Sequence, residues 1–295
     1  MENEKRAYDQ LKSRIINHIE DHNMKLGNLW YRGESKLFDS MPSTLYRQMN
    51  FNGEPDERKV SRLIHFNNIH HYEKWIYDKF TEELKEKDID LYRSITMNGW
   101  DIVFYMQHYG IPTRFIDWSE SLHTSLFFAT EKAHMNEEDA VLWLFEPKKM
   151  NEILRDSYQL QHPEPSNTYE NFVNAYFLRI NQDLGAAISP NSYSIGVYAS
   201  GDIERMHSQY GHFVFIPKEY RDMRSYIEEI VLGDSNLQER VLKKLIIPNN
   251  EAKLINRYLE SIGCDISKYR LNETPLINAK EYNFTEFINR YQTHS

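Results

Sequence analysis

The chain has 295 residues, of which 40% are hydrophobic and 27% charged, and it carries a formal net charge of −9 and a single cysteine, Cys264. This composition is typical of a globular protein with a sizeable core, and it excludes both an internal disulfide and the strongly basic footprint of a general nucleic-acid binder. The polar start of the chain, and apolar runs far shorter than the roughly 20 residues that a bilayer requires, indicate a cytoplasmic protein without a membrane-spanning segment.

The first half of the chain predicts helices around one short strand. Apolar residues recur at helical spacing in four segments, residues 5–22, 56–90, 100–109 and 120–134, of which the second forms one or two surface helices. An aromatic-rich run predicts a strand at residues 29–32. Gly110 ends the third helix. The segment IPTRFIDW at 111–118 is expected to be a connection, with Asp117 and Ser119 as N-caps of the fourth helix.

The second half adds strands and closes with helices. Apolar runs predict four strands, residues 140–145, 194–200, 212–217 and 243–248. The first of these is apolar on both faces and should be interior, and Pro147 begins a short helix after it. A loop at 159–168 precedes a helix through Phe172. A long helix capped by the Asn249–Asn250 pair and a short helix at 284–291 complete the chain.

The order of these elements favours an α+β fold. Short strands are interspersed with helices, without the regular alternation of a doubly wound parallel sheet and without internal repeats. We therefore expect a mixed central sheet of short strands flanked by helices. No break in composition marks a linker between domains.

The sequence lacks the motifs of several common sites. It contains no P-loop, GxGxxG, HExxH, CxxC or GxSxG. The histidines are scattered, and the neighbours His65, His70 and His71 lack the i, i+4 spacing of a helical metal site. We therefore expect no bound metal, and we interpret Cys264 as a buried or incidental thiol.

Two polar clusters stand in apolar and aromatic surroundings. The first is WYRGES at 30–35, in which Arg32 offers a rigid fork suited to phosphate or carboxylate. Gly33 follows it and would let a ligand approach the backbone closely. Taken alone, the hexamer favours a structural pairing of Arg32 with an acid such as Glu34.

The second cluster is QHYGIPTRFIDWSES at 107–121. Its polar side chains, and the two aromatic ones that bracket them, are His108, Thr113, Arg114, Asp117 and Ser119, with Tyr109 and Trp118. So many polar groups in one turn between two helices favour a functional site. A salt bridge between Arg114 and Asp117 that fixes the loop is the structural alternative.

These clusters belong to a longer set of motifs. The set is WYRGES, PSTLYR at 42–47, MQHYGIPTRFIDWSESLHTSLFFAT at 106–130, AVLWLF at 140–145, SQYGHFVF at 208–215 and LKKLIIP at 242–248. It resembles the FRG domain, a bacterial and phage-borne family named after its Phe/Tyr-Arg-Gly motif. The resemblance implies an N-terminal helix at 1–27, an FRG domain at 28–265, and a C-terminal helical tail at 266–295 packed on the same domain.

The layout of the motifs is similar to that of ADP-ribosyltransferases, with an arginine-bearing strand, a central motif leading into a helix, and a later strand bearing a catalytic polar residue. The resemblance implies that NAD is the substrate, in an ADP-ribosyltransferase-like toxin or defence effector that modifies a macromolecule, or in an NAD glycohydrolase. The residues implied in NAD binding are Arg32, Gly33, Tyr109, Thr113, Arg114 and Trp118. Those implied in catalysis are Gln209, His108, Asp117 and Ser119.

Position 209 departs from the transferase pattern, which has a glutamate there. Gln209 can orient ribose but cannot act as a base, so either His108 or Glu204 supplies the basic group or turnover is slow or absent. The residues that we expect to converge on one cleft are Arg32, His108, Asp117, Ser119 and Gln209.

Two further functions stay open. Gln209 favours a non-catalytic module that recognises a nucleotide or a phosphorylated partner. A nucleic-acid-processing protein would use Arg47, Arg114 and Arg205 in a groove, although the acidic balance counts against it. A toxin of the leading class has a macromolecular acceptor and can have a cognate inhibitor or antitoxin.

Overall fold

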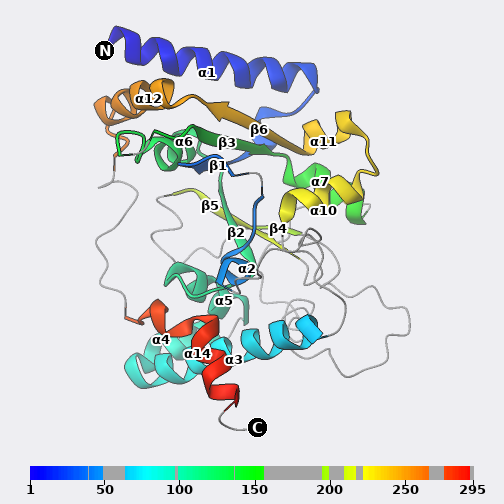
Figure 1. Cartoon of the computed structure of the whole chain (residues 1–295), viewed down its shortest axis with the longest axis vertical. Coiled ribbons are helices and arrows are strands. Elements are labelled where there is room, and N and C mark those ends of the chain that lie inside the picture. The colour runs from blue at the N-terminus through cyan, green and yellow to red at the C-terminus, as the bar shows by residue number, and fades with distance from the viewer. Residues whose placement is uncertain are drawn as a thin grey trace.

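The computed structural model contains a central sheet with helices on both faces, and its two termini lie at opposite ends of the molecule (Figure 1). The described residues are 1–38, 40–48, 64–96, 99–135, 137–155, 195–198, 209–216, 222–265 and 276–292. The predicted α+β class is confirmed. Among the described helices, none combines the length and the apolar character needed to cross a membrane.

Among the described residues, six short strands form the sheet in the spatial order β4-β5-β2-β1-β3-β6. Their bounds are β1 Trp30–Glu34, β2 Phe115–Ser119, β3 Ala140–Phe145, β4 Ile195–Tyr198, β5 Gly211–Phe215 and β6 Leu242–Ile247. Every pairing among these strands is antiparallel, so the expectation of a mixed sheet is wrong. β2 and β3 do run in the same direction, but the crossover through α6 (Leu122–Thr130) places them on opposite sides of β1, to which both are antiparallel.

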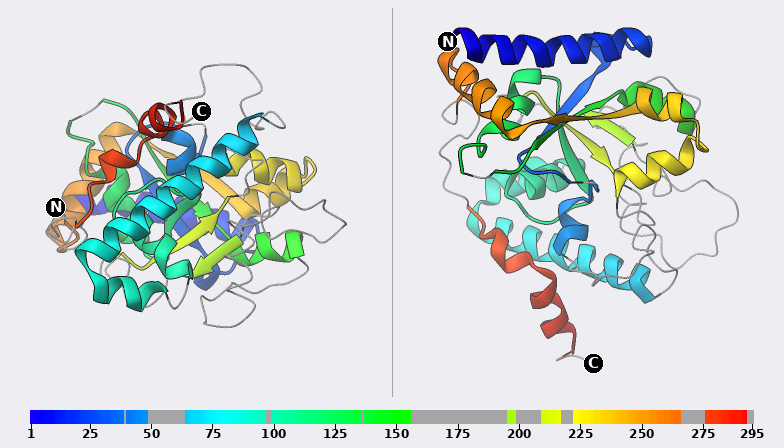
Figure 2. Two further views of the ribbon diagram at one scale, coloured as in Figure 1. Left: turned by 90° about the horizontal axis from the view of Figure 1, so that it is seen from below. Right: turned by 45° about the horizontal axis from the view of Figure 1, so that its top comes forward.

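Three helices cover one face of the sheet. They are α1 (Glu2–Asp21), α6 and α12 (Asn249–Ser261), and Figure 2 shows α1 lying beside α12 over β6. Leu11, Ile15 and Ile19 of α1 are buried at the predicted helical spacing. These side chains share one apolar core with Leu142 and Leu144 of β3.

The other face carries the remaining helices and a second apolar core. These helices are α2 (Thr44–Gln48), α3 (Ile64–Lys87), α4 (Ile89–Thr96), α5 (Gly99–His108), α7 (Pro147–Arg155), α10 (Met223–Ile230), α11 (Ser235–Val241) and α14 (Phe284–Gln292). In α3, Tyr72, Ile76 and Phe80 are fully buried, so one face of this charged segment belongs to the core. The hydroxyl of Tyr72 donates to the backbone oxygen of Tyr282 at 2.6 Å, which fixes the C-terminal segment on α3.

The sheet is almost split between β1 and β2. β1 pairs with β3, and β2 pairs with β5, along their whole lengths, whereas β1 and β2 share only the pair Tyr31–Ser119. The two strands therefore diverge, and in Figure 1 β2 runs steeply across the direction of β3 and β6. We name this region, formed by residues 31–34 and 117–119, the β1–β2 fork.

The segment at 111–118 differs most from its prediction. Phe115–Ser119 is the central strand β2 and not part of a connection, and all of its residues except Asp117 are buried. Asp117 and Ser119 consequently lie inside a strand and do not cap α6. The N-cap of α6 is Ser121, whose side chain accepts a hydrogen bond from an amide of the first turn.

The other predicted helix ends are mostly correct. Gly110 and Gly263 have φ values of 77° and 75° and follow the ends of α5 and α12, as predicted. The N-cap of α12 is Pro248, however, because the side chain of Asn249 instead donates to two backbone carbonyls before β3. The predicted loop at 159–168 and the helix through Phe172 lie outside the described residues.

Candidate active site

A cavity of about 340 Å³ opens at the β1–β2 fork. Its walls come from β1, β2, α6 and the α2 side chain Arg47. The sequence-predicted site residues that line it are Arg32, Gly33, Asp117, Trp118, Ser119 and Gln209. The fold thus brings residues from three distant parts of the chain around one space.

Arg32 bridges the fork. Its Nε donates to Oε1 of Glu34 at 3.1 Å, and its Nη1 donates to the backbone oxygen of Asp117 at 2.9 Å. Oε2 of Glu34 in turn accepts from Nε1 of Trp143 at 2.9 Å. The structural pairing with Glu34 is therefore present, and the same guanidinium group also holds the two diverging strands together.

Arg47 supplies a second guanidinium group to this cavity. In the part of the chain that the structure describes, that group makes no hydrogen bond or ion pair, and the residue stays accessible to solvent. Partial burial and the charge of Arg32 lower the pKa of Arg47, while the carboxylates of Asp117 and Glu34 oppose this shift. An uncommitted arginine fork beside a second arginine suits an anionic ligand.

Asp117 is held by a chain of hydrogen bonds. Nε2 of Gln107 donates to Oδ1 of Asp117 at 2.8 Å. Oε1 of Gln107 accepts a hydrogen bond from the hydroxyl of Thr113, a buried residue. The backbone N–H of Thr113 donates to the hydroxyl of Thr44 at 3.1 Å. These hydrogen bonds orient the exposed carboxylate of Asp117 toward the space between α5 and β2. Among the described residues, no salt bridge neutralises this carboxylate.

Ser119 anchors the turn that carries Gln209. Its hydroxyl donates to the backbone oxygen of Gln209 at 2.6 Å and accepts from the backbone N–H of Ser121 at 3.0 Å. The next residue, Tyr210, is 59% exposed and has a φ of 49°, in the left-handed region that tyrosine seldom adopts. A strained turn thus presents Gln209 to the cavity.

A second, smaller cavity of about 90 Å³ adjoins the first. The two share Asp117, Trp118 and Gln209, and the smaller one is completed by residues that include His108 and His212. His108 therefore lies on the far side of Asp117 and Gln209 from the arginine pair.

Two buried donors at the larger cavity have no hydrogen-bond partner among the described residues. They are Nε1 of Trp118 and the hydroxyl of Thr124, whose residues are 2% and 1% exposed. Leaving a buried polar group unpaired costs about 1–3 kcal/mol.

Part of this region matches a known protein family. Residues 27–138 match the FRG domain. No curated protein and no solved structure matches the chain. The FRG segment contains the arginine strand, the central motif and α6, and therefore most of the cavity wall. The division of the chain into an N-terminal helix at 1–27, a domain at 28–265 and a C-terminal tail at 266–295 stays a prediction.

Gly33, which lines the larger cavity, also packs directly against α6. A Cβ atom added there would lie 1.8 Å from the backbone oxygen of Ser125 and 2.7 Å from the backbone nitrogen of Ala129. Both atoms belong to α6. Glycine is needed because the helix backbone lies directly against β1 at this point.

Three residues predicted to bind NAD lie away from the larger cavity. Arg114 is fully buried, its Nε donates to Oε1 of Glu73 at 2.6 Å, and its guanidinium lies 4.3 Å from the ring centre of Phe215. Tyr109 packs against apolar side chains of the second core, and Thr113 acts through Gln107. Arg114 is therefore a core ion pair with α3, and the alternative salt bridge between Arg114 and Asp117 is not formed.

Some residues that line the two cavities were not among the predicted site residues. They include Glu34, Arg47 and Thr124 at the larger cavity and Gln107 at the smaller one. Arg47 lies in the motif PSTLYR, which precedes the central motif by a long segment, so only the fold reveals that the two meet. Glu204 and Arg205 lie outside the described residues.

Proposed function

We propose that the FRG domain binds NAD at the β1–β2 fork and cleaves its nicotinamide–ribose bond, as an ADP-ribosyltransferase or NAD glycohydrolase. The observation that carries this proposal is the presence of two arginines, Arg32 and Arg47, in one cavity that Asp117 also lines. A pyrophosphate carries adjacent negative charges that two planar forks satisfy with several hydrogen bonds. A volume near 340 Å³ lies within the range of ligand pockets.

The order of the motifs in the sheet supports the same proposal. Arg32 lies on β1, Asp117 on β2, and Gln209 immediately before β5. These three strands are neighbours in the sheet. The arginine strand, the central motif and the third motif of the transferase-like layout therefore meet at one place.

In the proposed reaction, the bond between C1′ of the ribose and the nicotinamide nitrogen breaks, and its electron pair leaves on neutral nicotinamide. C1′ passes through an oxocarbenium-like state and forms a new bond to an acceptor nucleophile or to water, which then loses a proton. We assign stabilisation of the positive charge to the carboxylate of Asp117, oriented by Gln107. His108, across the smaller cavity, is our candidate for accepting the proton.

Gln209 has a supporting role in this proposal. It lines both cavities, and its amide can hydrogen-bond the ribose hydroxyls. Because an amide cannot take up the proton, the proposal places the essential negative charge on Asp117 and not at position 209.

The first test is incubation of the purified protein with NAD, with and without cell extract, followed by measurement of free nicotinamide. Release without extract identifies a glycohydrolase, and release only with extract identifies transfer to a macromolecular acceptor, as expected of a toxin or defence effector. Arg47→Ala should weaken NAD binding without unfolding the protein, because the guanidinium has no partner to lose among the described residues. Arg6→Ala, at an exposed arginine on α1, is the matched control. Absence of release under both conditions contradicts the proposal.

The second test separates binding from chemistry. Asp117→Asn keeps the shape of the side chain and removes its charge, so turnover should fall by about 10²–10³-fold, the loss typical of one transition-state contact, while NAD affinity changes much less. Equal turnover in this variant and the wild type would remove Asp117 from the mechanism.

A non-catalytic nucleotide-binding module is the alternative, and one observation favours it. The hydroxyl proton of Ser119 is committed to a backbone carbonyl and position 209 is an amide, so neither can act as a base. In that case Arg47→Ala weakens NAD binding and no variant releases nicotinamide. The nucleic-acid groove loses support, because Arg114 is buried in a core ion pair.

A further inference from the structure

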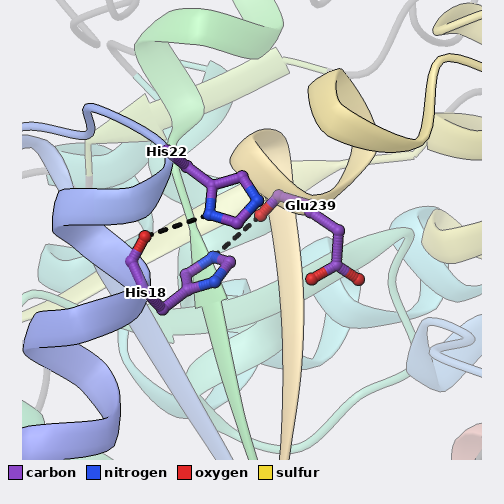
Figure 3. Close-up of side chains that lie close together, drawn as sticks. All are labelled: His18, His22 and Glu239. Atoms are coloured by element: carbon purple, nitrogen blue, oxygen red, sulfur yellow. Dashed lines mark hydrogen bonds between the residues drawn. The ribbon is translucent and has the colours of Figure 1, made fainter.

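Two histidines and a glutamate gather outside the fork, where the end of α1 lies against α11. His18 lies in the last turn of α1, His22 is its C-cap, and Glu239 belongs to α11 (Figure 3). One possible ligand atom from each residue lies within 4.8 Å of the other two. We propose that these three side chains bind a late first-row divalent metal ion, with Zn²⁺ as the reference.

The chemistry of the three groups selects this class of ion. Histidine nitrogens and a carboxylate oxygen are ordinary Zn²⁺ ligands, and three of them leave a fourth tetrahedral position for water. Mg²⁺ and Ca²⁺ prefer sites made only of oxygen. The i, i+4 spacing of His18 and His22 brings both imidazoles to the same side of α1, and their ring centres lie 4.2 Å apart.

Hydrogen bonds already orient both rings. Nδ1 of His22 lies 3.1 Å from the backbone oxygen of His18, and Nε2 of His18 lies 3.0 Å from the backbone oxygen of Glu239 (Figure 3). Because a carbonyl oxygen only accepts, each of these nitrogens must carry the proton, and the other nitrogen of each ring presents a lone pair. Such ring-to-carbonyl bonds fix the orientation of metal-binding histidines in proteins.

Closing the site needs only a modest contraction. Ligand atoms about 2.1 Å from a tetrahedral ion lie roughly 3.4 Å apart, compared with the present limit of 4.8 Å. His22 and Glu239 are only half-buried, so their side chains can move. Lys243 of β6 pairs with Oε2 of Glu239, and a carboxylate that holds a lysine through one oxygen can bind a metal through the other.

The ion would have a structural role. It would link α1, which covers one face of the sheet, to α11, which contributes to the core of the other face beside the edge strand β6. Since it involves no residue of the fork, this proposal does not depend on NAD.

The test is titration of Zn²⁺ into chelator-treated protein made without a polyhistidine tag, followed by calorimetry. Co²⁺, whose visible absorption reports coordination geometry, serves as the second probe. The wild type should bind one equivalent. His22→Gln and Glu239→Gln should each weaken binding by at least the roughly 10–100-fold that even outer-shell partners are worth. His134→Gln, at an exposed histidine outside the cluster, should leave the affinity unchanged.

Thermal melting with and without Zn²⁺ completes the experiment. Zn²⁺ should raise the melting temperature of the wild type and of His134→Gln, and should have little effect on His22→Gln. Melting in chelator shows whether each variant is folded, and if one of the two site variants fails to fold, the other decides. Absence of stoichiometric binding by the wild type, or equal affinity in all variants, overturns the proposal.

Discussion

Replacing Gly33 with alanine tests the contact between β1 and α6. The new Cβ would lie 1.8 Å from the backbone oxygen of Ser125. Carbon and oxygen atoms in van der Waals contact are about 3.4 Å apart, so the strand and the helix would have to separate by about 1.5 Å. Both walls are main chain, and no side chain can rotate away to make room.

The expected loss of stability follows from this geometry. Inserting a methyl group into a tight core costs about 1–3 kcal/mol, and a main-chain wall on both sides places Gly33→Ala at about 3 kcal/mol or more. Alanine recovers about 0.5–1 kcal/mol relative to glycine in a strand interior. The net loss should therefore be at least about 2 kcal/mol, a large part of the roughly 5–15 kcal/mol that stabilises a typical domain.

Urea denaturation measures this loss, with Gly27→Ala as the matched control because a Cβ at position 27 meets no atom within 4 Å. The midpoint of Gly33→Ala should fall clearly below those of the wild type and the control. Equal midpoints would refute the packing role of Gly33. If stability were unchanged and NAD binding were lost, the glycine would serve the approach of a ligand instead.

Three further predictions concern other parts of the structure. Glu73→Gln leaves the buried Arg114 without its counter-charge and should cost about 3–5 kcal/mol in denaturation, with NAD affinity of the folded protein unchanged. Burial and the nearby His22 lower the pKa of His18 below 6.5. With chelator present, the free energy of unfolding should therefore fall as the pH drops below about 6.5, and it should fall less in His18→Gln. Equal dependence of the unfolding free energy on pH in the two proteins would contradict this. Tyr210→Gly relieves a left-handed backbone and should raise stability by up to about 1 kcal/mol, whereas a loss of stability would show that the side chain outweighs the strain.

Elements whose pattern is local could be predicted from the sequence. β3 is apolar at all six positions and buried throughout, and α1 buries the apolar stripe that its spacing indicates. The positions at which α5 and α12 end follow from Gly110 and Gly263, whose backbone angles suit glycine. In each case the residues that determine the structure are adjacent in the sequence.

Elements that depend on distant partners could not be predicted. β2 carries Asp117 in its middle, and only its position between β1 and β5 shows that the segment is a strand. Arg114, which directly precedes β2, resembled a ligand-binding residue because its partner, Glu73, lies in α3, far away in the sequence. The polar interruptions that indicated a cleft did identify part of its wall, namely Arg32, Asp117, Ser119 and Gln209.

The i, i+4 spacing of His18 and His22 in α1 is a signal for a metal site that is present in the sequence itself. The histidines near residue 70 lack this spacing. Glu239, the third member, is distant in sequence and becomes visible only in the fold.

The single pair that joins β1 to β2 has a mechanical consequence. A sheet with continuous pairing resists bending between its strands, but here one residue pair joins β1 to β2. The contacts of Arg32, the stacking of Trp30 on His212 and the contact between the rings of Trp118 and Phe145 also hold the two halves together. A molecule that draws the guanidinium of Arg32 away from the backbone of Asp117 removes one of these links. An occupant of the fork would thus change the resistance of the sheet to bending at this point, and a compound of slightly different size could block the protein by holding the halves at the wrong angle.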